Sequence, residues 1–199
     1  MLPSYRRAFR ICAFCGALFF FAGNVARADD AQDINRMINA NQLEQAMQRV
    51  DAALVQKPKD AQMRFFRGVI LTQEGKNTDA INVFLQLTED YPELPEPYNN
   101  LAVLYASQGD YDKARAALEM AVRTHPGYAT AQENLGDIYA KLASQAYQRA
   151  VQLDASDSVA KKKLALIQNL LSNDSMPGKT PKKPPVPLSN THPARTPSM

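Results

Sequence analysis

The stretch that decides the fold runs from Pro95 to Gly127 and reads PEPYNNLAVLYASQGDYDKARAALEMAVRTHPG. Apolar residues recur at helical spacing on both sides of Gly109 and Asp110, which supply a turn. The two apolar faces consist of Leu101, Leu104 and Tyr105 in the first helix and Ala114, Leu118, Ala121 and Val122 in the second. Pro126 ends the second helix because proline cannot continue one. The stretch therefore predicts a pair of helices that pack against each other.

The same pattern recurs every 34 residues. Pro58, Pro92 and Pro126 each end an apolar-periodic run at this spacing. The positions in register are Gly68, Leu71, Gly75, Ala80 and Phe84 in one copy, Met37, Ala46, Val50 and Ala53 in the copy before it, and Leu135, Gly136 and Tyr139 in the last. Because one helical pair cannot bury both of its faces, neighbouring copies are expected to stack into a solenoid.

The run Tyr98-x-x-Leu101-Ala102-x-x-Tyr105, followed by Ala114, Leu118, Ala121 and Pro126, resembles the tetratricopeptide repeat. Arg64 and Arg67 depart from the apolar choices of that pattern. The resemblance implies an all-α fold, a right-handed α-solenoid of helix-turn-helix repeats with a C-terminal capping helix and a disordered tail. The expected segments are a degenerate first repeat at 29–60, repeats at 61–94 and 95–128, a shortened fourth repeat at 129–155, a capping helix at 156–172 and the tail at 173–199.

The fourth repeat lacks five residues, at the place of the turn between its helices. One apolar stripe continues through Leu135, Tyr139, Leu142, Ala146, Ala150 and Leu153. The sequence predicts a single helix from about Thr130 to Leu153, and the alternative is a tight turn near Ser144. The capping helix would place Val159, Leu164, Ile167, Leu170 and Leu171 on one side. Its run Lys161 to Lys163 is read as a solvated surface, with an anion site as the alternative.

Residues 1–28 have the organisation of a secretory signal peptide. Arg6, Arg7 and Arg10 precede an apolar run from Ile11 to Gly23, and Ala26-Arg27-Ala28 provides a cleavage site. The alternative, a membrane anchor, needs about 20 apolar residues. We therefore expect cleavage after Ala28 and a periplasmic protein, with no integral membrane segment once the signal is removed.

The positions of the cysteines and the distribution of charge exclude some classes of function. Both cysteines, Cys12 and Cys15, precede the expected cleavage site, so the mature chain has no disulfide. The body is mildly acidic, which argues against nucleic acid as a partner. The tail is basic and rich in proline, and its run from Pro181 to Pro187 is either a polyproline ligand or a solvated tether.

No catalytic constellation is visible in the sequence. The two histidines, His125 and His192, are not spaced as metal ligands, and no nucleophile-elbow, zinc-protease or phosphate-loop motif occurs. We expect no enzyme activity, no catalytic residues, no cofactor and no metal.

The family resemblance implies a partner-binding concave groove, lined by the first helix of each repeat. Carried over by position, its lining residues are Asn35, Ile38, Phe65, Val69, Thr72, Asn99, Val103, Glu133, Asp137 and Lys141. The family members that grip a C-terminal carboxylate use a set of Lys, Asn and Arg. The matching positions here hold Ala31, Phe65, Asn99 and Glu133, so that role is not expected. Phe65 is read either as a core residue or as a solvent-facing residue of the groove.

The groove changes from apolar to acidic along the array, and this predicts a ligand with an apolar anchor toward Phe65, Val69 and Val103 and a Lys or Arg toward Glu133 and Asp137. The chain's own basic tail is another candidate occupant. The predicted function is a periplasmic protein-binding adaptor or assembly scaffold whose protein or peptide partner the sequence does not identify. The alternative is a structural envelope factor whose tail contacts anionic envelope surface or peptidoglycan. Deleting residues 172–199 separates the two, because only the envelope factor needs the tail.

Overall fold

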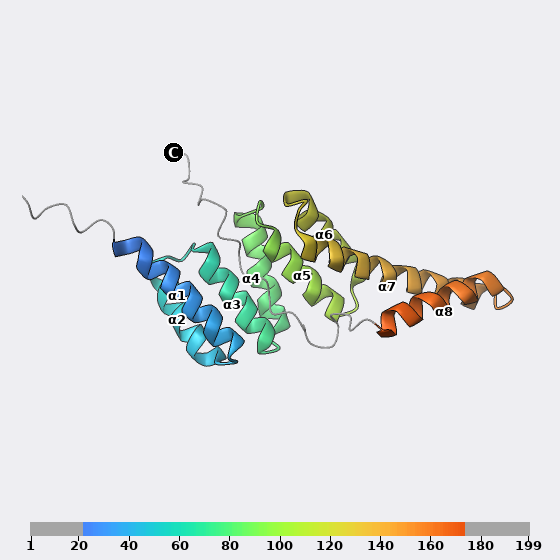
Figure 1. The fold of residues 1–199 in the computed structure, drawn as a ribbon, viewed down its shortest axis with the longest axis horizontal. Helices are drawn as coiled ribbons and strands as arrows, with labels where there is room; N and C mark the ends of the chain where they lie inside the picture. The colour runs from blue at the N-terminus through green and yellow to red at the C-terminus, as the bar shows by residue number, and fades with distance from the viewer. Residues whose placement is uncertain (1–21, 174–199) are drawn as a thin grey trace, which may run out of the picture.

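The computed structural model describes residues 22–173, and this part of the chain forms eight α-helices and no strand. The helices are α1 (Ala22–Asn39), α2 (Leu43–Gln56), α3 (Ala61–Gln73), α4 (Asn77–Asp90), α5 (Pro95–Ser107), α6 (Tyr111–Thr124), α7 (Ala129–Leu153) and α8 (Ser158–Asn173). They pack as four successive antiparallel pairs along one long axis (Figure 1). This arrangement confirms the expected all-α solenoid. Most of the expected signal peptide and the tail from residue 174 lie outside the described residues.

Three turns between paired helices share one backbone geometry. Asn41, Gly75 and Gly109, spaced by 34 residues, have φ angles of 57°, 74° and 80°. In each turn, the following N–H donates to the carbonyl five positions earlier at 2.9 Å. This left-handed conformation favours glycine and tolerates asparagine. The repeat seen in the sequence is therefore a repeat of turn chemistry as well as of apolar spacing.

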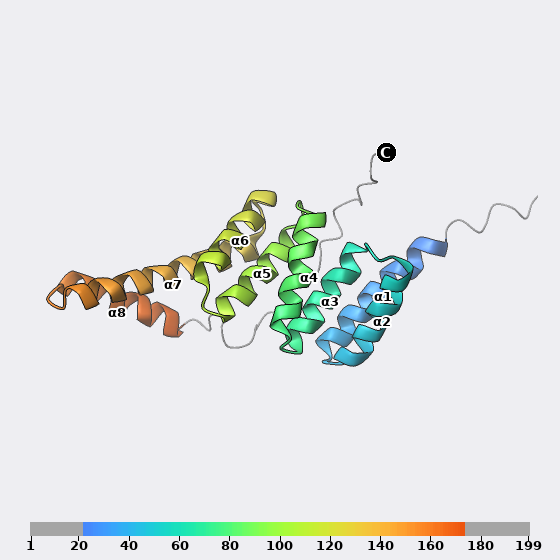
Figure 2. The same cartoon turned by 180° about the vertical axis from the view of Figure 1, so that it is seen from behind.

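The fourth pair breaks this rule. Counting 34 positions on from Gly109 reaches Ala143, which lies inside α7. A β-carbon makes the left-handed turn costly, while alanine is the best helix former. α7 runs unbroken for 25 residues, which confirms the predicted single helix and excludes a turn near Ser144. Figure 2 shows α8 folding back along the outer part of α7.

The apolar core has two parts that meet at α5. The first part fills α1 to α4 and includes Leu101 and Leu104 of α5. The second joins α5, α6 and the start of α7 around Ala102, Leu118 and Ile138. Because α5 contributes to both parts, it couples the two halves of the array.

The arginines that depart from the repeat pattern link α3 to its neighbours. Arg64 pairs with Asp90 at the end of α4, and Arg67 pairs with Asp51 of α2. Exposed pairs of this kind contribute little to stability, but Arg64 is mostly covered and its pair is better shielded from solvent. These side chains lie at helix contacts, which explains why the apolar choice is not needed there.

The orientation of α8 differs in part from the expected capping helix. Leu164, Ile167 and Leu171 are half-buried against α7, as expected for its inner side. Val159 and Leu170 are exposed, so their placement on that inner side is wrong. They lie about 100° around the helix from the inward row, because each precedes an inward residue by one position.

No helix within residues 22–173 is long and apolar enough to cross a membrane.

Candidate functional site

Helix α5 carries a buried polar row at the junction of the two core parts. Glu96, Asn99 and Asn100 are the buried polar or charged side chains among those that the structure describes. The Asn100 amide donates to the Glu96 main-chain carbonyl at 2.8 Å. Burying such groups is costly unless they are hydrogen-bonded. The packing of α5 therefore depends on specific polar contacts as well as on apolar contacts.

One amide pair joins α5 to α7. The side-chain Nδ2 of Asn134 donates to Oδ1 of Asn99 at 2.8 Å, where Asn99 is buried and Asn134 is half-buried. A hydrogen bond of this kind has a narrow geometry, so it fixes the position of α7 on α5 more specifically than apolar contact does. Asn99 was expected to face a ligand, and instead it is buried in this pair.

The charge of Glu96 on α5 acts on the phenol of Tyr128. Glu96 stands in the first turn of α5, where the helix dipole favours a negative charge. Tyr128 immediately precedes α7. Burial, and secondarily the charge of Glu96, raise the pKa of Tyr128. The shift widens the alkaline pH range over which this phenol stays protonated and able to donate a hydrogen bond.

The ten residues expected to line a groove fall into three classes of exposure. Ile38, Phe65, Val69 and Asn99 are buried, Asn35, Thr72, Val103, Asp137 and Lys141 are half-buried, and Glu133 is exposed. We use the term first-helix surface for the accessible part of this set, which comprises the last six residues. Its members are mainly polar, and Val103 is the apolar exception.

Phe65 belongs to the core. Its side chain is fully buried, and its ring packs against the ring of Phe84 with 5.6 Å between centroids. The neighbouring Phe66 is buried as well, because α3 is covered by α2 on one side and by α4 on the other. Val69 is buried with them, so the expected apolar anchor at Phe65 and Val69 is wrong.

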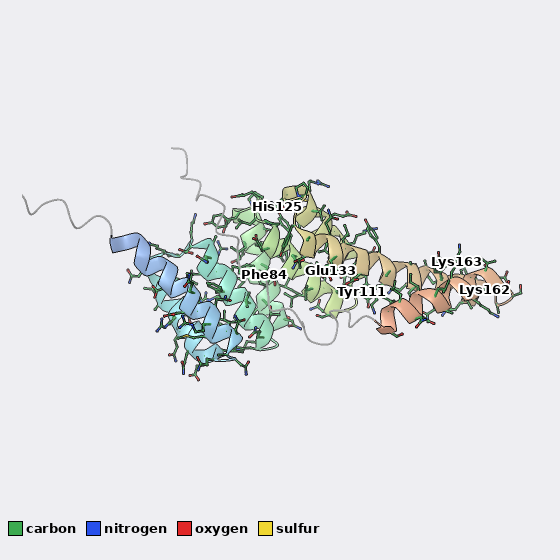
Figure 3. The ribbon with its side chains drawn as sticks, in the orientation of Figure 1. Phe84, Tyr111, His125, Glu133, Lys162 and Lys163 are labelled. Carbon is green, nitrogen blue, oxygen red and sulfur yellow. The ribbon has the colours of Figure 1, made fainter. Side chains whose placement is uncertain are left out.

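The accessible charges of the first-helix surface gather on the first half of α7. Glu133, Asp137 and Lys141 follow one another at intervals of four, which places them along one side of the helix. Figure 3 shows Glu133 near the base of α7, whereas Lys162 and Lys163 lie toward the far end of the α7–α8 pair. The acidic groups of this row therefore lie at the base of α7, with Lys141 one turn beyond Asp137 on the same side, and a cationic side chain would be attracted to the exposed Glu133.

Within residues 22–173, no group of three or more His, Cys, Asp or Glu residues is placed to hold a metal ion. The polar residues that sequence reasoning missed are Glu96, Asn100 and Asn134. Asn99 and Asn134 are separated by 35 positions, close to the repeat length, and that spacing was the available signal. A spacing of about one repeat places the same surface of α5 and α7, the first helices of successive pairs, against each other.

Two family models, both described as tetratricopeptide repeat, match the chain. One matches residues 38–95 and the other residues 71–138. Together they span residues 38–138, about half of the chain. The matched range ends at Ile138, where the outer part of α7 begins.

Among curated proteins, a chloroplastic tetratricopeptide repeat domain-containing protein of Arabidopsis thaliana, PYG7, is 39% identical over 92 residues. That match covers 41% of this chain and 31% of the relative. Photosystem I assembly protein Ycf3 of Prochlorococcus marinus is 31% identical over 104 residues, covering 51% of this chain and 60% of Ycf3. The chain thus spans less than two thirds of either relative.

Among solved structures, PilF of Pseudomonas aeruginosa superposes with a TM-score of 0.55 at 18% identity. The superposition covers 75% of this chain and 71% of PilF. At this identity the likeness shows the fold alone, and it agrees with the stacked helical pairs described above.

Proposed function

Because the chain belongs to the tetratricopeptide-repeat family, we propose that it is a periplasmic protein-binding adaptor or assembly scaffold without catalytic activity. Proteins of this family mediate protein–protein interaction and assembly. Ycf3 is named a photosystem I assembly protein. The stacked pairs present an extended surface of the kind that holds a segment of another protein.

The observation that carries the proposal is the charged base of α7. Glu133 is exposed there, and Asp137 lies one turn away on the same side. The exposed carboxylate of Glu133 gives this end of the helix a negative charge that can attract a Lys or Arg of a partner. Since Phe65 and Val69 are buried, the partner is recognised through charge and polar contact rather than through an apolar anchor.

The test reverses the charge of this pair. Glu133→Lys combined with Asp137→Lys is compared with the wild-type protein in affinity capture from a periplasmic extract at low and high salt. The matched control is Glu89→Lys with Glu93→Lys, two exposed acids at the end of α4 and in the following loop, which changes net charge equally. We expect the first variant to remain folded and to lose the captured partners in a salt-sensitive manner. Unchanged capture at low salt by that variant would contradict the proposal.

Export is the second part of the proposal and has its own support. The basic start, apolar run and Ala26-Arg27-Ala28 motif make a cleavable signal, with the mature chain beginning at Asp29. This cut lies inside α1, yet the residues of α1 known to be buried, Ala31, Ile34 and Ile38, all follow it. The first helix would keep its packing after cleavage. Mass spectrometry of the exported protein tests this, and retention of residues 1–28 would contradict a periplasmic location.

A further inference from the structure

The outer part of the α7–α8 pair is positively charged, whereas the rest of the array is acidic. From Asp29 to Lys141 the chain has 11 Lys and Arg against 17 Asp and Glu, a net charge of −6. Residues 142–173 have four basic residues, Arg149 and Lys161 to Lys163, against two acidic ones, a net charge of +2. Figure 3 shows Lys162 and Lys163 toward the far end of this pair. An anionic surface is therefore attracted to one end of the array and repelled by the rest.

The two acids of this segment serve the turn between the helices. Asp154 accepts hydrogen bonds from the N–H and the hydroxyl of Ser156 at 2.8 and 2.6 Å. Asp157 accepts from the N–H groups of Val159 and Ala160, both at 2.9 Å, at the start of α8. The positive end of the α8 dipole offsets part of the charge of Asp157. The cations further along the two helices therefore dominate the charge of this end.

The same pair also exposes large apolar side chains. Of those exposed in the described part of the chain, Val55 and Leu85 lie on α2 and α4, and all the others lie on α7 or α8. Those others are Tyr139, Leu153, Val159, Leu166 and Leu170. Leu153 is 90% exposed and Leu166 is 71% exposed. Exposed apolar groups that gather in one place mark a site of interaction with a protein or a membrane.

These apolar side chains form two rows on one side of the pair. In α8, Val159, Leu166 and Leu170 each precede by one position a residue that packs on α7, so their row lies about 100° around the helix from that contact. In α7, Tyr139, Ala146 and Leu153 are rotated by a similar angle, in the same sense, from the half-buried residues that face α8. The helices are antiparallel and face each other, so the same rotation brings both rows to the same side. We call these six residues the apolar rows.

Cations border the apolar rows. About the axis of α8, Lys162 and Lys163 lie about 60° and about 40° from the centre of its row, on opposite edges, whereas Lys161 lies about 160° away. Arg149 lies about 60° from the row of α7, on the edge away from α8. The ammonium of Lys163 lies 5.5 Å from the centre of the Tyr147 ring, which holds it between the two helices. An apolar middle with a cationic border is the arrangement of helices that lie in a membrane interface.

We propose that this side of the α7–α8 pair docks on an anionic phospholipid surface, with both helices lying along the membrane plane. Charge selects this occupant. A second copy of the chain would set Arg149, Lys162 and Lys163 against their own counterparts, whereas anionic headgroups pair with all three. The long stems of Lys and Arg keep their charged ends among the headgroups while the apolar rows enter the boundary of the acyl chains.

The size of the surface also favours a membrane over a protein. The stretch from Tyr139 to Leu153 is about 21 Å long and two helices are about 20 Å wide, which gives about 400 Å² in projection. A stable protein interface of ordinary size buries about 800 Å² of accessible surface on each partner. Membrane binding has no such minimum, because each inserted apolar side chain and each cation adds to the affinity by itself.

Vesicle flotation measures the docking directly. The protein expressed from the full chain, in the form that the producing cell makes, is mixed with vesicles of phosphatidylglycerol and phosphatidylcholine in equal parts, or of phosphatidylcholine alone. We expect binding to the anionic vesicles to be about tenfold tighter or more than binding to the neutral ones, because each cation near an anionic surface contributes about fivefold. Raising the salt concentration from about 0.1 to about 0.5 M should weaken it.

One pair of variants tests the apolar rows. Leu166→Glu places a carboxylate among them and should weaken binding to the anionic vesicles by about tenfold or more. Ala165→Glu adds the same charge at an exposed position on another side of α8, and should weaken binding by less than about threefold.

A second pair tests the cationic border. Lys162→Gln combined with Lys163→Gln should weaken binding to the anionic vesicles by about 20-fold, from about fivefold for each cation. The matched control is Lys57→Gln with Lys59→Gln, two exposed lysines between α2 and α3. It removes the same charge far from the proposed surface and should leave binding unchanged.

Three results would overturn the proposal. A wild-type protein that binds neither kind of vesicle would leave the apolar rows to a protein partner. Equal binding to both kinds would show that anionic headgroups are not recognised, and equal effects within either pair of variants would place the binding surface elsewhere. Circular dichroism of each variant verifies that the helices remain formed, and the lysine variants change only exposed side chains, which contribute little to folding. None of these readouts depends on capture of a partner at the base of α7.

Discussion

The ring of Phe84 lies where a β-carbon on residue 68 would be: an ideal β-carbon built on Gly68 falls 2.6 Å from Cζ of Phe84. The equivalent pair one repeat later is Ala102 and Leu118, both buried, where a smaller side chain on the second helix leaves room for a methyl group. One repeat further on, a β-carbon on Gly136 would meet nothing within 4 Å, because α7 continues instead of turning back.

Gly68→Ala should destabilise the protein by about 1–2 kcal/mol, because overpacking costs about 1–3 kcal/mol and alanine recovers up to about 1 kcal/mol of helix propensity. The Phe84 ring is fully buried against Phe65 and has little freedom to move away. Gly136→Ala is the matched control and should stabilise by about 0.5–1 kcal/mol. Urea denaturation measures both changes. A Gly68→Ala variant as stable as the wild type would show that the close approach is easily relieved.

Combining Gly68→Ala with Phe84→Leu should recover part of the lost stability. The double variant reproduces the Ala102 and Leu118 pair inside the preceding repeat. Phe84→Leu alone leaves a cavity, and an added methyl at residue 68 fills part of it. We expect a favourable coupling of about 0.5–3 kcal/mol in a double-mutant cycle. Strict additivity of the two single variants would mean that these side chains do not contact each other in solution.

Gly109→Ala should cost about 1 kcal/mol even though no atom lies within 4 Å of its β-carbon position. The reason is the backbone, since φ at this residue is 80°. Asn41→Gly, at the equivalent position of the first pair, should leave stability within about 0.5 kcal/mol of the wild type or raise it. Thermal unfolding of both variants provides the measurement. If Gly109→Ala were neutral, the turn would have another accessible conformation.

The N-cap of α6 should make stability depend on pH. The side-chain hydrogen bond from Lys113, aided by its backbone N–H, lowers the pKa of Asp110. A carboxylate with a lowered pKa in the folded state stabilises it above the unfolded pKa of about 3.9, and this contribution is lost as pH falls through the folded value. Asp110→Ala should therefore be less stable than the wild type at pH 7. The difference should shrink as pH falls below about 4, which denaturation at several pH values will test.

The helical pairs and the long α7 could be predicted from the sequence alone. Both follow from local rules, the left-handed turn residues at a spacing of 34 and their replacement by Ala143. The burial of Phe65 was harder to predict, because it depends on how closely α2 and α4 both approach α3. Periodicity gives the direction of a side chain but not the number of neighbouring helices around it.

The same limit applies to the outer part of α7. The stripe from Leu135 to Leu153 was correctly recognised as continuous, yet its outer part has no helix against it within the described chain. An apolar stripe predicts that something packs there and does not say whether the neighbour belongs to the same chain. The amide pair of Asn99 and Asn134 was not predicted, because neither asparagine belongs to a recognisable motif. Their hydrogen bond forms only when α5 and α7 come together in the fold.

The unbroken α7 also has a mechanical consequence. Its base is held by α6 and by the amide pair on α5, while its outer part extends about 21 Å beyond that attachment with α8 strapped along it. The outer part of α7 can therefore pivot as a rigid unit about its attached base, beside Glu133 and Asp137. A tilt of about 5° at the base displaces the tip by about 2 Å for an arm of this length. A ligand that tilted the base of α7 would therefore also move the distant tip of the α7–α8 pair.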